Sequence, residues 1–278
     1  LDNARIASDL LALQADQLTG QIGYQSKTGF YSTDLTATLF GQPVTVEMGP
    51  HLTTRADAVL AAAFQFEAAV ADISAWQSTS VAIPAQGVAP VIVKVVVADA
   101  VTVDIQSDLE GVAVDLPLPW GKAAGSRAPV HVQWNSRASP AWRAFWFGRF
   151  SAVADFSDPG TAIASIDVTP RTRPASRPLM LPDSGVLLTG FMPSLDLAQW
   201  SSWGIVSTGP SFVETVPVSV QSLRVGQLEW RGEALGALSL EASVEGVRVD
   251  AQFSLPWLRG TFQQQPSLPR RGAVEQLD

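Results

Sequence analysis

The sequence predicts an all-β, mainly antiparallel fold in which a long curved amphipathic sheet forms an open apolar groove, with a few short helices. Two observations lead to this prediction. Stretches in which apolar and polar residues alternate recur along the 278 residues, separated by turn-forming residues, and alternation places the apolar side chains of a strand on one face. Hydrophobic residues also make up 46% of the chain and charged residues only 16%, so few charges are present to cover a large apolar surface.

The stretch Val101–Lys122 shows the pattern most clearly. Its apolar positions alternate with polar ones on both sides of a turn, and they are Val101, Val103, Ile105, Val112, Val114 and Leu116. The turn is Ser107–Gly111, and Pro117 and Pro119 end the pattern because neither can donate a backbone hydrogen bond. This stretch predicts a hairpin of two strands with one apolar face that needs a covering partner.

Two other stretches fit a helix as well as a strand. Residues 1–21 and 56–70 contain helix-forming residues, but both also alternate with period two, and we favour strands for both. Two segments, Asp72–Trp76 and Asp196–Trp200, predict short helices in which the aspartate caps the first turn and the tryptophan packs back onto the sheet. Their similarity suggests a duplicated strand-rich module.

The later chain continues the strand pattern. Residues 142–150 are rich in tryptophan and phenylalanine and predict a hairpin that turns at Gly148–Arg149. The C-terminal third alternates most regularly, with Val216, Val218 and Val220, and then Val247, Val249 and Phe253, on single faces. We expect residues 1–265 to form one β-groove segment, followed by residues 266–278 as a polar tail or a truncated next strand.

Composition excludes several function classes. There is no cysteine, which excludes disulfides and thiol chemistry, and the net charge of −8 disfavours nucleic acid as a partner. The two histidines, His51 and His131, are not spaced as metal ligands, and His131 is expected to be a structural or surface residue. No phosphate loop or nucleophile elbow occurs, and Lys122 is expected to be a loop cation. We therefore expect no enzyme activity, no cofactor and no metal.

The chain has no apolar run long enough for a transmembrane helix, and it begins at Leu1. We interpret it as a piece of a longer polypeptide, whose targeting signal or membrane anchor would lie outside these residues. The aromatic residues of 142–150 allow two interpretations. Core packing between strands is favoured, and contact with a membrane interface is the alternative.

Several of these residues carry a family likeness. The segments Ser107–Gly111, Asp115–Pro119 and Gly121–Lys122 resemble the central region of the YhdP family, within the AsmA-like group. Further points of likeness, in matching order, are Gly41, Asp72, Leu181–Gly190, Asp196 and Leu258–Gly260. The likeness covers roughly residues 20–265. Trp120 stands where the family is expected to have a smaller aliphatic residue.

The resemblance implies a periplasmic segment of a protein anchored in the inner membrane, reaching toward the outer membrane. It implies phospholipid acyl chains as ligands, contact with both membranes through parts outside this segment, and no catalytic residues. Protein partners stay unknown. The residues support this independently, because a wall of aliphatic side chains removes the cost of exposing an acyl chain to water without any polar recognition motif.

We predict twelve lining residues for the groove, on the apolar positions of the alternating stretches. They are Val101, Val103, Ile105, Val112, Val114, Leu116, Val216, Val218, Val220, Val247, Val249 and Phe253. Two alternatives stay open. One is a structural or interaction β-protein with a closed apolar core, and the other is a carbohydrate-active enzyme whose carboxylates meet only on folding.

Overall fold

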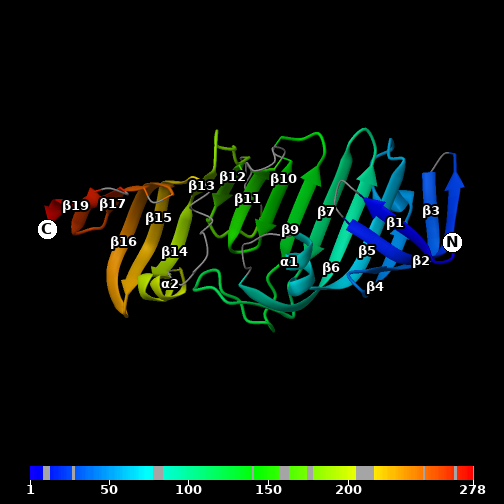
Figure 1. Ribbon diagram of the computed structural model, residues 1–278, viewed down its shortest axis with the longest axis horizontal. Helices are drawn as coiled ribbons and strands as arrows, with labels where there is room; N and C mark the ends of the chain where they lie inside the picture. Colours follow the sequence, from blue (N-terminus) through cyan, green and yellow to red (C-terminus); the bar gives the residue numbers. More distant parts are fainter. Residues whose placement is uncertain are drawn as a thin grey trace. The chain divides into compact units, whose positions relative to one another are not determined.

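The computed structural model describes residues 1–8, 13–26, 29–77, 84–139, 141–156, 163–173, 178–204, 216–246, 248–265 and 268–277. Over these residues the protein is mostly β, an open and mainly antiparallel sheet with a few short helices, which confirms the predicted fold class (Figure 1). The chain divides into two compact units. Unit 1 comprises Leu1–Asp115 and Lys122–Trp142, and unit 2 comprises Leu116–Gly121 and Arg143–Asp278.

Unit 1 is an antiparallel sheet in which β2, β3, β4, β5, β6, β7 and β9 pair in that order. The strands are β1 (Ala4–Ser8), β2 (Leu13–Gln25), β3 (Gly29–Leu39), β4 (Gln42–Met48), β5 (Leu60–Ala69), β6 (Ala85–Val97), β7 (Val101–Ser107), β8 (Val112–Val114) and β9 (Val130–Asn135). A 3-10 turn, η1 (Pro50–Leu52), and helix α1 (Val70–Gln77) connect them. The two ambiguous stretches are strands, as predicted: β1 and β2 lie within residues 1–25, and β5 contains most of the alanine-rich stretch.

The predicted hairpin of Val101–Lys122 is wrong in its pairing, although both strands exist. β8 does not pair with β7; it pairs with the first residues of β6, where Ala85 lies opposite Val114. β6 is 13 residues long and β7 only 7, so β7 covers Ile92–Val97 and leaves the beginning of β6 free for β8. The other edge of β7 pairs with β9. The alternating pattern correctly predicts the two strands but does not predict which strands pair with them.

Unit 2 begins with a mixed region and ends in an antiparallel meander. Its strands are β10 (Trp142–Trp146), β11 (Phe150–Asp155), β12 (Ile163–Asp167), β13 (Val186–Thr189), β14 (Phe191–Asp196), β15 (Val218–Trp230), β16 (Glu233–Glu245), β17 (Arg248–Ser254), β18 (Leu258–Gln265) and β19 (Leu268–Leu277). β13 pairs in parallel with β12 and β15, and β14 in parallel with β15, whereas β15 to β19 pair antiparallel in sequence. The predicted turn between β10 and β11 at Gly148–Arg149 is confirmed. Within residues 266–278, the structure places β19 against β18.

Both short helices predicted from the Asp-to-Trp segments are present. In α2 (Leu197–Gly204), the Asp196 carboxylate accepts hydrogen bonds from the Ala198 and Gln199 amides at 2.8 and 3.3 Å, which is the expected N-cap. The cap predicted at Asp72 is wrong, because α1 begins at Val70 and Asp72 lies within its first turn. There its charge still favours the helix N-terminus, but it does not occupy the capping position.

Candidate functional site

Unit 1 carries a surface that we call the unit 1 apolar face, built from rows of residues paired across neighbouring strands. The first row is Leu35, Val46, Phe64, Val93, Ile105 and Val132. The second row is Met48, Ala62, Val95, Val103 and Trp134. Directly paired residues of antiparallel strands point to the same side, so both rows belong to one face. Because the strands pair in this register, the apolar side chains of separate strands form one continuous apolar surface.

This face is only partly covered. Leu35, Val46 and Val103 are buried, with 1%, 5% and 3% of their surface exposed. Val93 and Ile105 in the same rows are half-buried. Burial of apolar surface stabilises the folded state by about 25 cal/mol per Å². A closed core would gain this stabilisation by burying all of these side chains. The unit 1 apolar face therefore keeps apolar surface that a ligand can still cover.

The opposite side of the unit 1 sheet is polar and centred on Asp104. Its carboxylate accepts hydrogen bonds from Gln106 at 2.7 Å and from Gln133 at 3.0 Å, and it lies 2.5 Å from His131 Nε2. Burial raises the pKa of Asp104, but the hydrogen bonds from Gln133, His131 and Gln106 together outweigh it and hold the pKa below its usual value. A pocket of about 330 Å³ lies on this side, where Asp104, Lys94 and His51 are among the lining residues.

Unit 2 carries a second such surface, the unit 2 apolar face, on β15 to β18. Its rows are Val218, Val244 and Val249; Val220, Ala242, Ala251 and Phe262; and Leu223, Leu240, Phe253 and Gly260. The apolar positions of β15 change from even to odd numbers between Val220 and Leu223, because a bulge with Ser222 at φ 51° inserts an extra residue. Gly260 leaves room for the Phe253 ring, which lies 3.0 Å from where a β-carbon would stand.

Part of unit 2 has a closed core, formed where Leu116–Gly121, which we call the strap, packs. Trp120 of the strap packs against a buried cluster that includes Val168 and Val225, each 1% exposed. The Trp120 and Trp200 rings meet edge to face at 5.1 Å, and Trp200 Nε1 donates a hydrogen bond to the Leu118 carbonyl at 3.3 Å. Helix α2 therefore holds the strap through an aromatic contact and a hydrogen bond.

Arg149 links the strap to the aromatic hairpin of β10 and β11. Its guanidinium donates a hydrogen bond to the Pro119 carbonyl and lies 4.8 Å from the centre of the Trp146 ring. Trp146 in turn meets Phe150 edge to face at 5.6 Å. Burial lowers the pKa of Arg149 from its usual value. The aromatic residues of this hairpin thus pack against one another and hold a cation among them.

Lys122 lies outside the named strands, between β8 and β9, which agrees with the expectation of a loop cation, but it is buried, with 7% of its surface exposed. Its ammonium group donates to the carbonyls of Leu109 and Val112 at 2.7 Å and of Ala123 at 3.1 Å. These backbone acceptors compensate the lost hydration of the charge and fasten the turn before β8 to the residues after the strap. Nothing in the local sequence shows that these carbonyls meet around one lysine.

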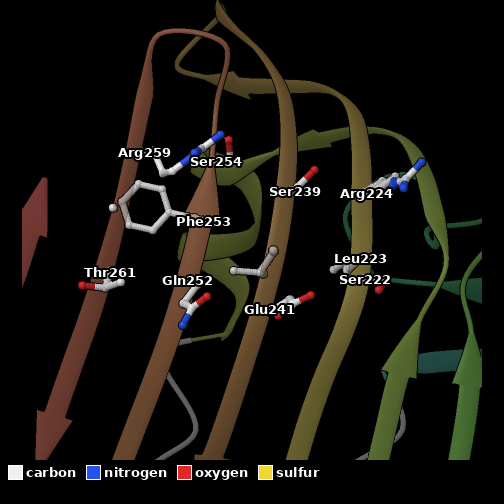
Figure 2. Close-up of a pocket in the computed structure, with 12 residues that line it drawn as sticks. Ser222, Leu223, Arg224, Ser239, Glu241, Gln252, Phe253, Ser254, Arg259 and Thr261 are labelled. Atoms are coloured by element: carbon white, nitrogen blue, oxygen red, sulfur yellow. The ribbon is translucent and has the colours of Figure 1, made fainter. Parts of the chain in front are cut away.

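An open pocket of about 320 Å³ lies across β15 to β18, and its lining combines residues of the polar side of the unit 2 sheet with Leu223, Leu240 and Phe253 (Figure 2). Arg224, Ser239, Ser254 and Arg259 are paired in one row across these strands. Figure 2 shows Arg259 beside Ser254, and Glu241 with Gln252 in the next row. This side is hydrophilic, so the unit 2 sheet is amphipathic in the same sense as that of unit 1.

Comparison with known protein families shows which family this chain belongs to. The model of the family described as YhdP protein matches residues 1–275. This chain belongs to the YhdP family. The resemblance seen in the sequence is thereby confirmed, and the match extends beyond the predicted residues 20–265 at both ends. The comparisons with curated proteins and with solved structures find no match.

Within the described residues, no helix is long and apolar enough to cross a membrane. Within the same residues, no cluster of three or more histidine, aspartate or glutamate side chains is arranged to hold a metal ion.

The structure brings the predicted lining residues together in groups. Val101, Val103 and Ile105 lie on the unit 1 apolar face, and Val218, Val220, Val249 and Phe253 lie on the unit 2 apolar face. Val112 and Val114 lie in β8, Leu116 in the strap, and Val216 two residues before β15. Val247 lies outside the described residues. That all twelve line one groove stays a prediction.

The sequence alone does not predict the packing of the strap or the contacts of Arg149. Trp120 was noted only as a departure from the family pattern, and the structure places it against the buried cluster of unit 2. The one available signal was the density of tryptophan around residues 120, 146 and 200, since aromatic rings of this size pack where they can bury their surface. The sequence could not show which rings meet.

Proposed function

We propose that this chain is a periplasmic segment of a lipid-carrying envelope protein, which moves phospholipids between the inner and outer membranes along its apolar faces. Membership of the YhdP family supports this proposal. The single observation that carries it is the unit 1 apolar face, on which apolar side chains stay in register across six strands and several of them, such as Val93 and Ile105, are only half-buried. A carrier of this kind needs no catalytic residue, cofactor or metal.

The free energy gained by removing an acyl chain from water is available along the whole apolar face, which suits transport of a lipid. Each methylene of an acyl chain removed from water contributes about 0.8 kcal/mol, and a row of valine and isoleucine side chains offers this gain at every step along the face. The described rows of the unit 1 apolar face consist of apolar side chains, so no polar group within these rows retains the lipid at one position. The acyl chain can therefore shift along the rows without crossing a high barrier.

The alternative of a closed β-protein is favoured by one observation. Each unit contains a buried cluster, with Trp120 packed against that of unit 2 and with Leu35 and Val46 in that of unit 1, so part of each unit is a finished core without any ligand. The two functions differ in what the purified chain contains: a carrier retains phospholipid, and a closed β-protein contains none.

The test is lipid extraction and mass spectrometry of the purified full chain, with two neighbouring variants. Ile105→Asp places a charge on the unit 1 apolar face, and Gln106→Asp places the same charge on its polar side. We expect the wild type and Gln106→Asp to carry phospholipid and Ile105→Asp to lose most of it, since an acyl chain cannot cover a solvated charge. Equal lipid content in the two variants, or none in the wild type, would refute the proposal.

A further inference from the structure

Arg149 differs from the other arginines whose side chains the structure describes. Arg55 is also half-buried, but it forms ion pairs with Asp57 and Asp99. The remaining arginines are exposed. Arg149 is half-buried and has no carboxylate partner among the described residues; its contacts are the Pro119 carbonyl and the Trp146 ring.

This leaves most of the guanidinium uncompensated. The group has five N–H donors in a planar fork, and among the described residues only the Pro119 carbonyl accepts a hydrogen bond from one of them. A half-buried cation without a counterion is unfavourable, and the lowered pKa of Arg149 has burial as its cause with no acidic neighbour opposing it. An anion with two or more oxygen acceptors would satisfy the fork.

The surroundings of Arg149 lack acceptors as well. The indole Nε1 atoms of Trp120 and Trp146 are buried and have no hydrogen-bond partner among the described residues. Both tryptophans are tied to Arg149, one through its neighbour Pro119 and the other through its ring. Ser151 Oγ is a third buried atom without a partner among the described residues, and alternation places it on the other side of β11 from Phe150.

The site also adjoins apolar surface. Trp120 packs against the same cluster as Leu240 and Val220 of the unit 2 apolar face. A molecule bound by its anionic group at Arg149 can thus lay an apolar chain on that face. The ligand that fits both features is an amphiphile whose phosphoryl group adjoins hydrocarbon.

We propose that Arg149 binds the phosphoryl group of a phospholipid whose acyl chains lie on the unit 2 apolar face, with the indole N–H groups of Trp120 and Trp146 as additional donors. This inference rests on the proposed function and adds a headgroup site to it. Guanidinium and phosphoryl groups form paired, charge-assisted hydrogen bonds, which suit this role better than a lysine would.

The experiment compares binding of three probes to the full chain: a phospholipid, the diacylglycerol with the same acyl chains, and inorganic phosphate. The variants are Arg149→Gln, Arg149→Lys, Trp120→Phe, and the control Arg143→Gln, an exposed arginine on β10 of the same unit. Thermal melting of each variant establishes that it is folded.

We expect Arg149→Gln to weaken phospholipid binding about tenfold, Arg149→Lys and Trp120→Phe to weaken it less, and Arg143→Gln to leave it unchanged. Diacylglycerol binding should stay the same in all four variants. Equal losses for phospholipid and diacylglycerol, or no loss in Arg149→Gln, would overturn the proposal. Displacement of phospholipid by millimolar inorganic phosphate would overturn the lipid source in favour of free phosphate.

These outcomes are separate from the test of the proposed function. If the wild type binds neither lipid, the carrier function fails. If the wild type binds both lipids and Arg149→Gln still does not distinguish them, only the headgroup site fails.

Discussion

Each unit contains a sheet with one apolar face, and the two units differ in how that face is covered. In unit 1 the apolar face is made by residues in continuous register; it is buried at β3 and β4, where Leu35 and Val46 belong to a buried cluster, and residues farther along, such as Val93 and Ile105, stay half-buried. In unit 2 the strap brings Trp120 onto a buried cluster, and Val168 and Val225 are 1% exposed. The difference teaches that alternation alone does not decide whether an apolar face is open. A covering segment decides it, and that segment can come from a part of the chain with no strand pattern.

The largest effect should come from a charge in the covered core of unit 2. Val225→Asp buries an unpaired carboxylate, and we expect a loss of about 4 kcal/mol or more in the free energy of unfolding. The neighbouring change Arg224→Asp, on the polar side of the same strand, should cost far less. Denaturant unfolding of both variants measures this. Similar losses for the two variants would mean that the core under Trp120 is not closed.

The same charge on the face of unit 1 should be better tolerated. Ile105 is half-buried, so an aspartate there keeps part of its hydration, and we expect a loss of about 1–2 kcal/mol. The measurement is the same unfolding experiment. A loss as large as that of Val225→Asp would show that the unit 1 apolar face is a closed core, which would also weaken the lipid-carrier proposal.

Sequence pattern gave the strands of both faces, because period two is a local property of the backbone. It did not give the pairing of β8 with β6, because that pairing depends on the lengths of β6 and β7 rather than on alternation. The shift of apolar positions at Ser222 was also hidden, since a bulge leaves no reliable mark in the sequence.

The candidate sites were harder to foresee for a related reason. Trp120 and Trp200 are 80 residues apart in the sequence, and the hydrogen bond from Arg149 to the Pro119 carbonyl joins residues 30 positions apart. Contacts of this range follow from the tertiary fold. The burial of Lys122 is equally hidden in the sequence, as is the lack of a carboxylate partner for Arg149 among the described residues, because burial and partners exist only once distant segments meet.

A smaller effect should separate the two helices. Asp196 caps α2, which holds the strap of unit 2, whereas Asp72 lies inside the first turn of α1 in unit 1. We expect Asp196→Ala to cost about 1 kcal/mol and Asp72→Ala only about 0.5 kcal/mol, because the second change removes a helix-dipole interaction and no capping hydrogen bond. Thermal melting followed by circular dichroism measures both. A larger loss for Asp72→Ala would contradict the assignment of the caps.

The last effect, similar in size to the loss of the α2 cap, concerns the polar side of unit 1 and depends on pH. The hydrogen bonds to Asp104 stabilise its charged form and, against the opposing effect of burial, lower its pKa in the folded state. Such a group contributes stability above its unfolded pKa of about 3.9, and the contribution is lost as the pH falls through the lower folded value. Asp104→Asn should therefore cost about 1 kcal/mol at pH 7, and this cost should shrink as the pH falls through the folded pKa of Asp104.

The control for this last change is Asp183→Asn, at an exposed aspartate of unit 2, whose cost should be small at both pH values. Unfolding at pH 7 and at about pH 3 gives the difference directly. If the cost of Asp104→Asn stays the same at acid pH, the network of Gln106, His131 and Gln133 does not depend on the charge of the carboxylate. The polar side of unit 1 would then be held by neutral hydrogen bonds alone, and its apolar face would carry the larger share of the stability of that unit.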